Sequence, residues 1–259
     1  MATKTLLTLA RSSSSRFFNP IRNASSSKIY ELRTYNIKPE CMKPFVDLSL
    51  EKFHIRTRFS VLHGYWTAEI GGINQVVHIW EYDNYVHRAN VRKELAGNQD
   101  WISQYFSKIL PMFTTQTNVG MMSLDNGDQP DIIHPEGQGV YELWSMTTEN
   151  YVHRGVKELK KSLESSIDGN GKSILCGSFR STLGPQGNVY FLMRHENFDE
   201  AIDFRTQWLS NKGMSNSCQT FTYLNRKLSF NEEKALTFKV QILFLSLQIL
   251  HWMESRISK

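Results

Sequence analysis

The chain has 259 residues, which is enough for two domains of ordinary size with additional segments. Its formal net charge is +5, from 30 basic and 25 acidic side chains. Five of the basic residues precede Glu31, the first acidic residue: Lys4, Arg11, Arg16, Arg22 and Lys28. The rest of the chain is neutral, which argues against a nucleic-acid-binding surface.

Residues 1–27 are rich in Arg and Ser and contain no acidic residue. Apolar residues near the start can form one side of a short helix flanked by Lys4 and Arg11. This composition is typical of a mitochondrial transit peptide, whereas a secretory signal needs a longer apolar run. We therefore predict a mitochondrial protein, in the matrix or associated with a membrane, with cleavage between Ile21 and Ser27.

The first elements predicted after this segment are a strand, a helix and a two-stranded hairpin. The helix begins near Pro39 and ends near residue 57, with apolar residues three and four positions apart. The turn of the hairpin contains Gly71 and Gly72, and glycine allows the positive φ of a tight reversal. The three strands are expected at residues 29–35, 61–70 and 75–82.

A second helical region follows the hairpin. Asp83 and Asn84 provide N-cap oxygens, and from residue 85 the apolar period changes from two to about 3.6. A break is expected near Gly97, where Asn98 or Asp100 can cap a new start. The region ends before Pro111, and residues 113–122 read as a strand, which completes the order β-α-β-β-α-β.

The same order is predicted again after a linker at residues 124–138. Tyr30 aligns with Tyr141, and residues 189–193 match residues 76–80 of the first repeat. The repeated strands and helices are expected at residues 140–146, 152–167, 173–183, 189–193, 198–209 and 219–228. Two copies of one supersecondary unit make a tandem domain pair and not a solenoid.

The order β-α-β-β-α-β is that of a ferredoxin-like fold, an antiparallel sheet with two helices on one face. Bulky side chains point to both faces of each predicted sheet, so the open faces also need a cover. We predict an α+β protein with two ferredoxin-like domains, residues 28–123 and 139–230, packed face to face as a pseudo-dimeric α+β barrel.

The tail at residues 231–259 has no counterpart in the repeat. Its apolar part is too short to span a membrane. It is open whether it forms an amphipathic helix in peripheral contact with a membrane or partner, forms an extra core element, or results from altered splicing or translation.

Chemically versatile side chains concentrate in the first repeat, which holds four histidines, but their spacing matches no metal-binding or catalytic motif. Structural histidines are one reading, and a metal site or a general base formed by histidines of separate elements is the other. The cations near helix ends either interact with the helix dipole or form an anion pocket in which Arg33 and Arg88 face a carboxylate or phosphate. Cys41, Cys176 and Cys218 form no CxxC pair, which suits a reduced compartment. No catalytic residue, metal ligand or cofactor is assigned. The residues of a candidate pocket are Arg33, His54, Arg56, Trp66, His78, Trp80, His87 and Arg88.

At residues 29–35 (IYELRTY), 63–66 (HGYW), 77–84 (VHIWEYDN) and 86–95 (VHRANVRKEL), the sequence resembles the NipSnap family of mitochondrial proteins. The resemblance extends over residues 28–230 and implies tandem domains of the dimeric α+β barrel superfamily. It also implies a role in vesicle traffic or in marking damaged mitochondria for autophagy, with autophagy adaptors as protein partners. We therefore expect a non-enzymatic interaction protein, able to form a homo-oligomer and without a nucleic-acid partner. The alternative is a small-molecule-binding or cofactor-independent oxygenase-like barrel that uses the candidate pocket.

Overall fold

The computed structural model describes residues 28–124, 132–148, 153–167, 169, 171–210, 225–229 and 235–247. The predicted transit peptide, its cleavage site and Cys218 lie outside the described residues, as do residues 219–224 of the predicted last strand.

The first repeat has the predicted order of strands and helices. Its strands are β1 (Ile29–Ile37), β2 (Val61–Ile70), β3 (Gln75–Tyr82) and β4 (Phe113–Ser123). Its long helices are α1 (Met42–Arg56) and α2 (Tyr85–Gly97). Between α2 and β4 the chain forms α3 (Gln99–Trp101), a π-helix η2 (Ile102–Phe106), α4 (Ser107–Ile109) and a 3-10 turn η3 (Leu110–Met112). Another 3-10 turn, η1 (Pro39–Cys41), precedes α1.

The predicted helix caps are present. The Asn84 side chain accepts a hydrogen bond from the His87 backbone N–H at 2.8 Å and starts α2. Asn98 accepts one from the Trp101 N–H at 2.8 Å and starts α3, so the predicted break after Gly97 is confirmed. Capping satisfies backbone donors that the first helical turn leaves without partners.

The second repeat consists of β5 (Val140–Thr148), α5 (His153–Ser166), β6 (Ser173–Leu183), β7 (Asn188–His195) and α6 (Phe198–Ser210). Two further strands follow, β8 (Asn225–Ser229) and β9 (Ala235–Leu247). Both repeats carry a register shift at the same place, between Leu62 and Gly64 in β2 and between Leu175 and Gly177 in β6.

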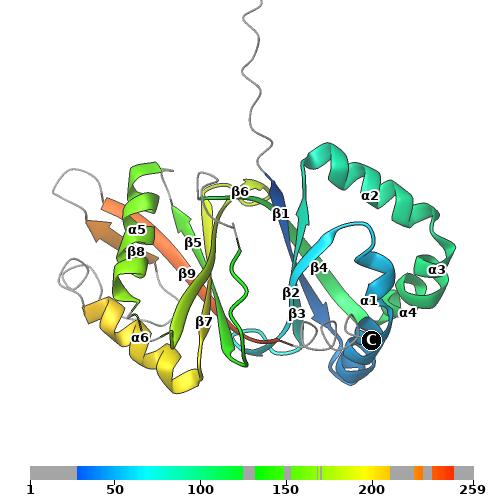
Figure 1. Cartoon of the computed structure of the whole chain (residues 1–259), viewed down its shortest axis with the longest axis horizontal. Helices are drawn as coiled ribbons and strands as arrows, with labels where there is room; N and C mark the ends of the chain where they lie inside the picture. Colours follow the sequence, from blue (N-terminus) through cyan, green and yellow to red (C-terminus); the bar gives the residue numbers. More distant parts are fainter. Residues whose placement is uncertain are drawn as a thin grey trace, which may run out of the picture.

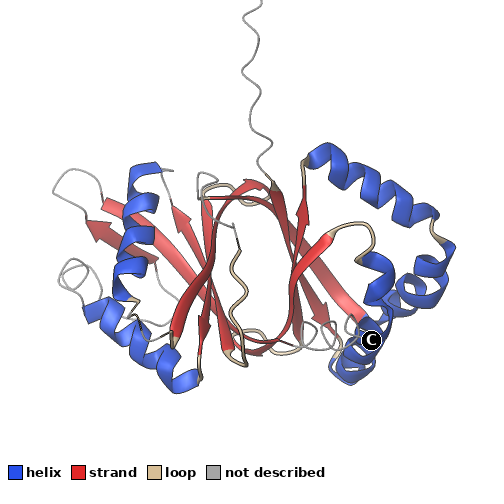
Figure 2. Cartoon of the chain, in the orientation of Figure 1, coloured by secondary structure: helices blue, strands red, loops and turns tan. Residues whose placement is uncertain are grey.

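The strands form one sheet in the order β2-β3-β1-β4-β6-β7-β5-β9, and β9 pairs again with β2, so that the sheet closes into a ring. Figures 1 and 2 show this ring with α1 to α4 outside it at one end and α5 and α6 outside it at the other. The α+β fold with two ferredoxin-like units packed as a pseudo-dimer is therefore as predicted.

The position of the last ring strand differs from the prediction. β9 lies in the segment that we assigned to a tail outside the repeats, with an extra core element as one alternative. It pairs with β5 as β4 pairs with β1, and with β2 as β4 pairs with β6. The strand expected at residues 219–228 has its described part in β8, which pairs with β9. A mostly apolar run of this length fits a strand or a helix by periodicity, and the pairing partners decide between them.

Apolar side chains form three buried clusters. One fills the ring and includes Tyr30, Trp66, Ile79 and Phe179 from the inward faces of the strands. The other two lie between the ring and the helices of each repeat. Among the described residues, no helix is both long and apolar enough to span a membrane.

Candidate ligand-binding site

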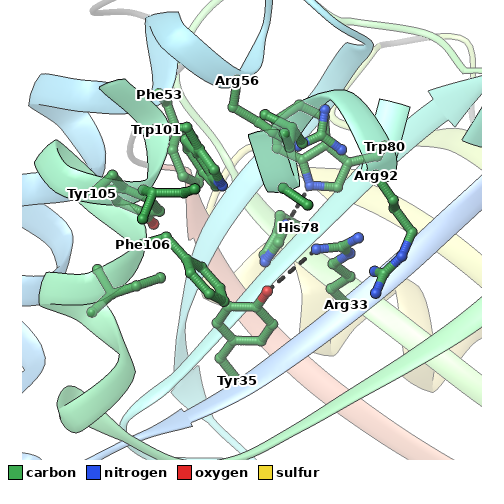
Figure 3. A pocket seen from close by; sticks show the side chains of 14 residues that line it. Arg33, Tyr35, Phe53, Arg56, His78, Trp80, Arg92, Trp101, Tyr105 and Phe106 are labelled. Carbon is green, nitrogen blue, oxygen red and sulfur yellow. Dashed lines mark hydrogen bonds between the residues drawn. The ribbon is translucent and has the colours of Figure 1, made fainter. Parts of the chain in front are cut away.

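A cavity of about 360 Å³ lies between the outer face of the first repeat's sheet and the helices that cover it (Figure 3). Its size is within the range of roughly 300–1,000 Å³ found for small-molecule sites. Its lining comes from β1, β3, α1, α2, α3, η2 and α4: Arg33, Tyr35, Phe53, Arg56, His78, Trp80, Arg92, Leu95, Ala96, Trp101, Ile102, Tyr105, Phe106 and Ile109.

The strand side of the cavity follows from the alternation of side chains along β1 and β3. Arg33 and Tyr35 are two residues apart on β1, and His78 and Trp80 are two residues apart on β3. Arg33 is directly opposite His78 in the antiparallel pair, so the two side chains leave the sheet on the same face. The register therefore gathers these four residues on the face that the helices cover.

The imidazole of His78 is almost fully buried and uncharged. Its Nδ1 accepts a hydrogen bond of 2.6 Å from the indole N–H of Trp80, and an indole N–H can only donate. The proton of the neutral ring is therefore on Nε2. Burial, followed by the nearby positive charge of Arg33, holds the pKa of His78 well below its usual value of 6.5. His78 thus provides the cavity with a neutral N–H donor.

Glu31 lies beneath the strand side of the cavity and is almost completely buried. Its carboxylate accepts hydrogen bonds from Arg33 Nη2 at 2.8 Å, Arg88 Nη2 at 2.5 Å, Asn118 Nδ2 at 2.7 Å and the Tyr82 hydroxyl at 3.1 Å. Burial alone would raise the pKa of Glu31, but the charge of Arg33 and the hydrogen bonds from Arg88, Arg33 and Asn118 hold it far below its usual value. The carboxylate is therefore ionised and fully engaged with donors.

Arg56 carries a positive charge deep in the same region. Its Nη1 donates to Ser60 Oγ at 2.6 Å and its Nη2 to the Tyr82 hydroxyl at 2.8 Å. The guanidinium lies 4.1 Å from the centroid of the Trp80 ring, in a cation–π contact. Burial lowers the pKa of Arg56, and the positive charge of Arg33 adds to this effect, but arginine keeps its proton in proteins.

The opposite wall of the cavity is mainly aromatic. Trp101, Tyr105 and Phe106 come from α3 and from the π-helix η2, an irregular helix type that is frequent at functional sites. Figure 3 shows these three rings on one side, and Arg33 together with the exposed Arg92 of α2 on the other. The cavity therefore has a cationic side and an apolar, flat-walled side.

Half of the eight predicted pocket residues line this cavity, namely Arg33, Arg56, His78 and Trp80. The other half do not, because Trp66 points into the ring, where it packs 5.6 Å from Tyr141, and His54 lies exposed on α1. His87 is at the start of α2 and contacts Asp83, and Arg88 reaches the buried Glu31. The single pocket predicted from all eight is therefore corrected by the structure.

The prediction from the sequence omitted several residues that line the cavity, and for two of them, Arg92 and Tyr35, the sequence pattern indicated the right face. Arg92 is one helical turn beyond Arg88, so the helical period places both on the same side of α2. Tyr35 continues the alternation of Glu31 and Arg33 along β1. The aromatic wall carried no such signal, since a π-helix changes the side-chain period that sequence patterns rely on.

In the second repeat, the equivalent strand positions carry apolar side chains. β5 and β7 pair in the same register as β1 and β3: Trp144 is opposite Phe191 where Arg33 is opposite His78. Met193 takes the position of Trp80. These three residues are fully buried in one cluster with two aromatic residues of α6, Phe204 and Trp208.

The buried carboxylate is common to both repeats. Glu142 takes the position of Glu31 and accepts hydrogen bonds from Arg205 and from Trp144 Nε1, the latter at 3.0 Å, and His195 Nε2 is 3.1 Å away. The ion-pair cluster is thus common to both repeats, whereas among the described residues His78 and Arg33 are replaced by apolar side chains in the second repeat. In the described part of the chain, no three metal-ligating side chains form a group that could hold a metal ion.

Comparison with known proteins identifies relatives of this chain. The NIPSNAP family model matches residues 30–123, the repeat that contains the cavity. Protein NipSnap homolog 3B of Mus musculus is 34% identical over 178 residues, which cover 68% of this chain and 70% of that protein. The chain belongs to the NipSnap family. NipSnap homolog 3A of Homo sapiens is 33% identical over 178 residues, covering 66% of this chain and 68% of that protein.

Among solved structures, the fold of this NipSnap protein is similar to that of a Fusobacterium nucleatum protein that has been proposed to be a monooxygenase. The two are 10% identical, with a TM-score of 0.56 over 86% of this chain and 93% of the other. At this identity the similarity concerns the fold alone.

Proposed function

We propose that this NipSnap protein binds a small organic molecule in the cavity of its first repeat. The observation that carries the proposal is the difference between the two repeats. The same register places Arg33 and His78 around a cavity in one repeat and the apolar Trp144 and Phe191 in a buried cluster in the other.

Energetics supports the same conclusion. An open cavity forgoes the stabilisation of close packing, and the burial of a guanidinium or imidazole costs free energy unless it has partners. The second repeat demonstrates that this fold accommodates an apolar filling at the same positions. A cationic cavity is therefore not required by the fold, and ligand binding gives it a purpose.

Binding is also favoured over the oxygenase-like alternative. A proton-abstracting reaction needs a base beside the substrate. Among the lining residues, His78 has its Nδ1 occupied by the Trp80 N–H, and the nearby Glu31 is saturated with donors. The described groups of the cavity thus donate hydrogen bonds and are poorly suited to accept a proton.

We further propose that the protein acts in mitochondria, as the composition of residues 1–27 and the family membership suggest. The adaptor role in mitochondrial quality control or vesicle traffic stays a prediction from the family resemblance. The same applies to autophagy adaptors as partners, to self-association and to peripheral membrane contact through the tail. A ligand in the first repeat is compatible with such a role, since its occupancy can report a metabolic state to a protein partner.

Fluorescence titration of the purified full chain tests the binding proposal. The probes are neutral N-phenyl-1-naphthylamine and 8-anilinonaphthalene-1-sulfonate, which share one apolar body, and either is expected to bind once per chain. Ala96 is exposed at the cavity, so Ala96→Trp should block binding, whereas Ala89→Trp, at an exposed position of α2 that does not line the cavity, should not. The proposal fails if neither probe binds, or if both variants bind as the parent does.

A further inference from the structure

We infer that the cavity selects an organic carboxylate with a flat apolar body, such as an aromatic monocarboxylate. The inference rests on the proposed function, which requires only that some small molecule binds there, and it adds the chemical class of that molecule.

The polar groups of the lining are the first support, because they are donors. The guanidinium groups of Arg33, Arg56 and Arg92 can only donate, and His78 has its N–H at Nε2. The Tyr35 hydroxyl accepts from Arg33 Nη1 at 3.4 Å, which leaves its own hydrogen available for donation. A ligand group that only accepts hydrogen bonds can pair with all of these donors. An amide or amine would instead place some of its own N–H donors against the donors of the lining.

The charge of the lining is the second support. Three guanidinium groups line the cavity and none of the lining residues is acidic. Glu31 is the acidic partner of Arg33, and it is shared with Arg88. The partners of Arg56 among the described residues are two hydroxyl groups and the rings of Trp80 and Tyr82, and the buried Nε of Arg33 has no acceptor there. An anion in the cavity would offset this excess of positive charge at low dielectric constant.

The ends of the helices favour a single charge over a phosphate. Phosphate sites commonly use the backbone N–H groups at a helix N-terminus. Here the long helices contribute residues from their C-terminal turns, Phe53 and Arg56 from α1 and Leu95 and Ala96 from α2. The cavity is also lined by Trp101 and Ile102 from the start of α3 and η2, but their backbone N–H groups already donate to Asn98. A helix C-terminus carries partial negative charge, which disfavours a dianion. The planar fork of a guanidinium matches a carboxylate instead.

The remainder of the lining defines the body of the ligand. Trp101, Tyr105 and Phe106 face the cationic side across the cavity in Figure 3, and Phe53 and Trp80 also line it. Aromatic side chains pack well against flat apolar groups and contribute large contact areas. The structure thus provides an anion end and an aromatic end within one cavity of limited volume.

Isothermal titration calorimetry of the full chain with an isosteric pair of probes tests the inference. Naphthalene-2-carboxylate is expected to bind at least about tenfold more tightly than naphthalene-2-carboxamide. Arg92→Gln should weaken binding of the carboxylate by about five- to tenfold and leave that of the amide unchanged. Arg92 is exposed, so the variant should fold, and Lys93→Gln removes a charge from the next exposed residue of α2 as a matched control.

The possible failures are distinguishable. Equal affinity for the carboxylate and the amide overturns the inference, as does an equal effect of Arg92→Gln on both probes or an effect of Lys93→Gln as large as that of Arg92→Gln. If the naphthylamine fluorophore binds at the cavity and the carboxylate does not, the carboxylate class is wrong and the binding function stands. If no probe of either experiment binds, both proposals fall.

Discussion

Replacement of Glu31 by Gln should weaken the fold and strengthen anion binding at the same time. Glu31 is buried and is the carboxylate partner of Arg33 and Arg88. Removing one partner of a buried ion pair costs about 3–5 kcal/mol of stability. The lower end is expected, because Gln keeps the size of the side chain and Arg88 is partly exposed and can turn to water.

The gain in ligand affinity has an electrostatic cause. Two unit charges 4 Å apart interact by about 4 kcal/mol near a protein surface, so Glu31 offsets much of the charge that Arg33 presents to the cavity. If a ligand at a greater distance recovers about a third of this energy, its affinity rises about tenfold. Urea unfolding followed by circular dichroism measures the loss of stability, and calorimetry with naphthalene-2-carboxylate measures the gain in affinity.

The second repeat provides the matched control. Glu142→Gln disrupts the corresponding cluster with Arg205 and His195, so it should cost a similar amount of stability and leave the affinity for the carboxylate unchanged. If Glu31→Gln binds the carboxylate no more tightly than the parent, or if Glu142→Gln raises the affinity equally, the assignment of Arg33 to the ligand is refuted.

Three further predictions concern the stability of the fold. A Cβ at Gly64 would overlap the buried indole ring of Trp66, so Gly64→Ala should lower the free energy of unfolding in urea by about 1–3 kcal/mol. Gly97→Ala, whose Cβ meets no atom within 4 Å, should change it by less than about 1 kcal/mol, and equal effects would contradict the packing of Trp66 against Gly64. Burial and the charge of Arg33 lower the pKa of His78, so below pH 6.5 the unfolded chain binds a proton that the folded chain does not. The free energy of unfolding should therefore decrease by up to about 1.4 kcal/mol for each unit by which the pH is lowered below 6.5. Urea unfolding at several pH values should show this slope in the parent and a smaller slope in His78→Phe, and equal slopes would exclude His78 as its source. Leu245 pairs with both β2 and β5, so Leu245→Pro should remove a ladder hydrogen bond and lower the melting temperature by several degrees, and an unchanged melting curve would argue against ring closure by β9.

Local signals made the order of elements in the first repeat predictable. The turn glycines, the caps at Asn84 and Asn98 and the change of period at residue 85 act over a few residues and are visible in the sequence. The last ring strand was not predictable in the same way. Its partners are β2 and β5, and pairing between distant segments leaves no mark on the periodicity of the segment itself.

The candidate site was likewise predictable only where local sequence patterns determine it. Arg33, His78 and Trp80 were predicted pocket residues and line the cavity, whereas Tyr35, which shares a strand face with Arg33, was not predicted. Which face of the sheet carries a cavity depends on how the helices pack, and so Trp66, on the inward face of β2, was grouped with residues that lie on the outer face. Arg88 shows another limit of prediction from the sequence, because its guanidinium forms an ion pair with the buried Glu31 and does not line the cavity.

The closure of the ring by β9 has a consequence for how this protein folds. Most strand pairs within a repeat join segments close in the chain, but β2 and β9 lie near opposite ends of the described residues. Pairing across such a separation has a high loop-closure cost, so it should form after the local hairpins. Until it forms, β2 and β9 each expose an unpaired edge that can add strands from another molecule. The slowest pairing step is therefore also the one that protects folding intermediates from aggregation.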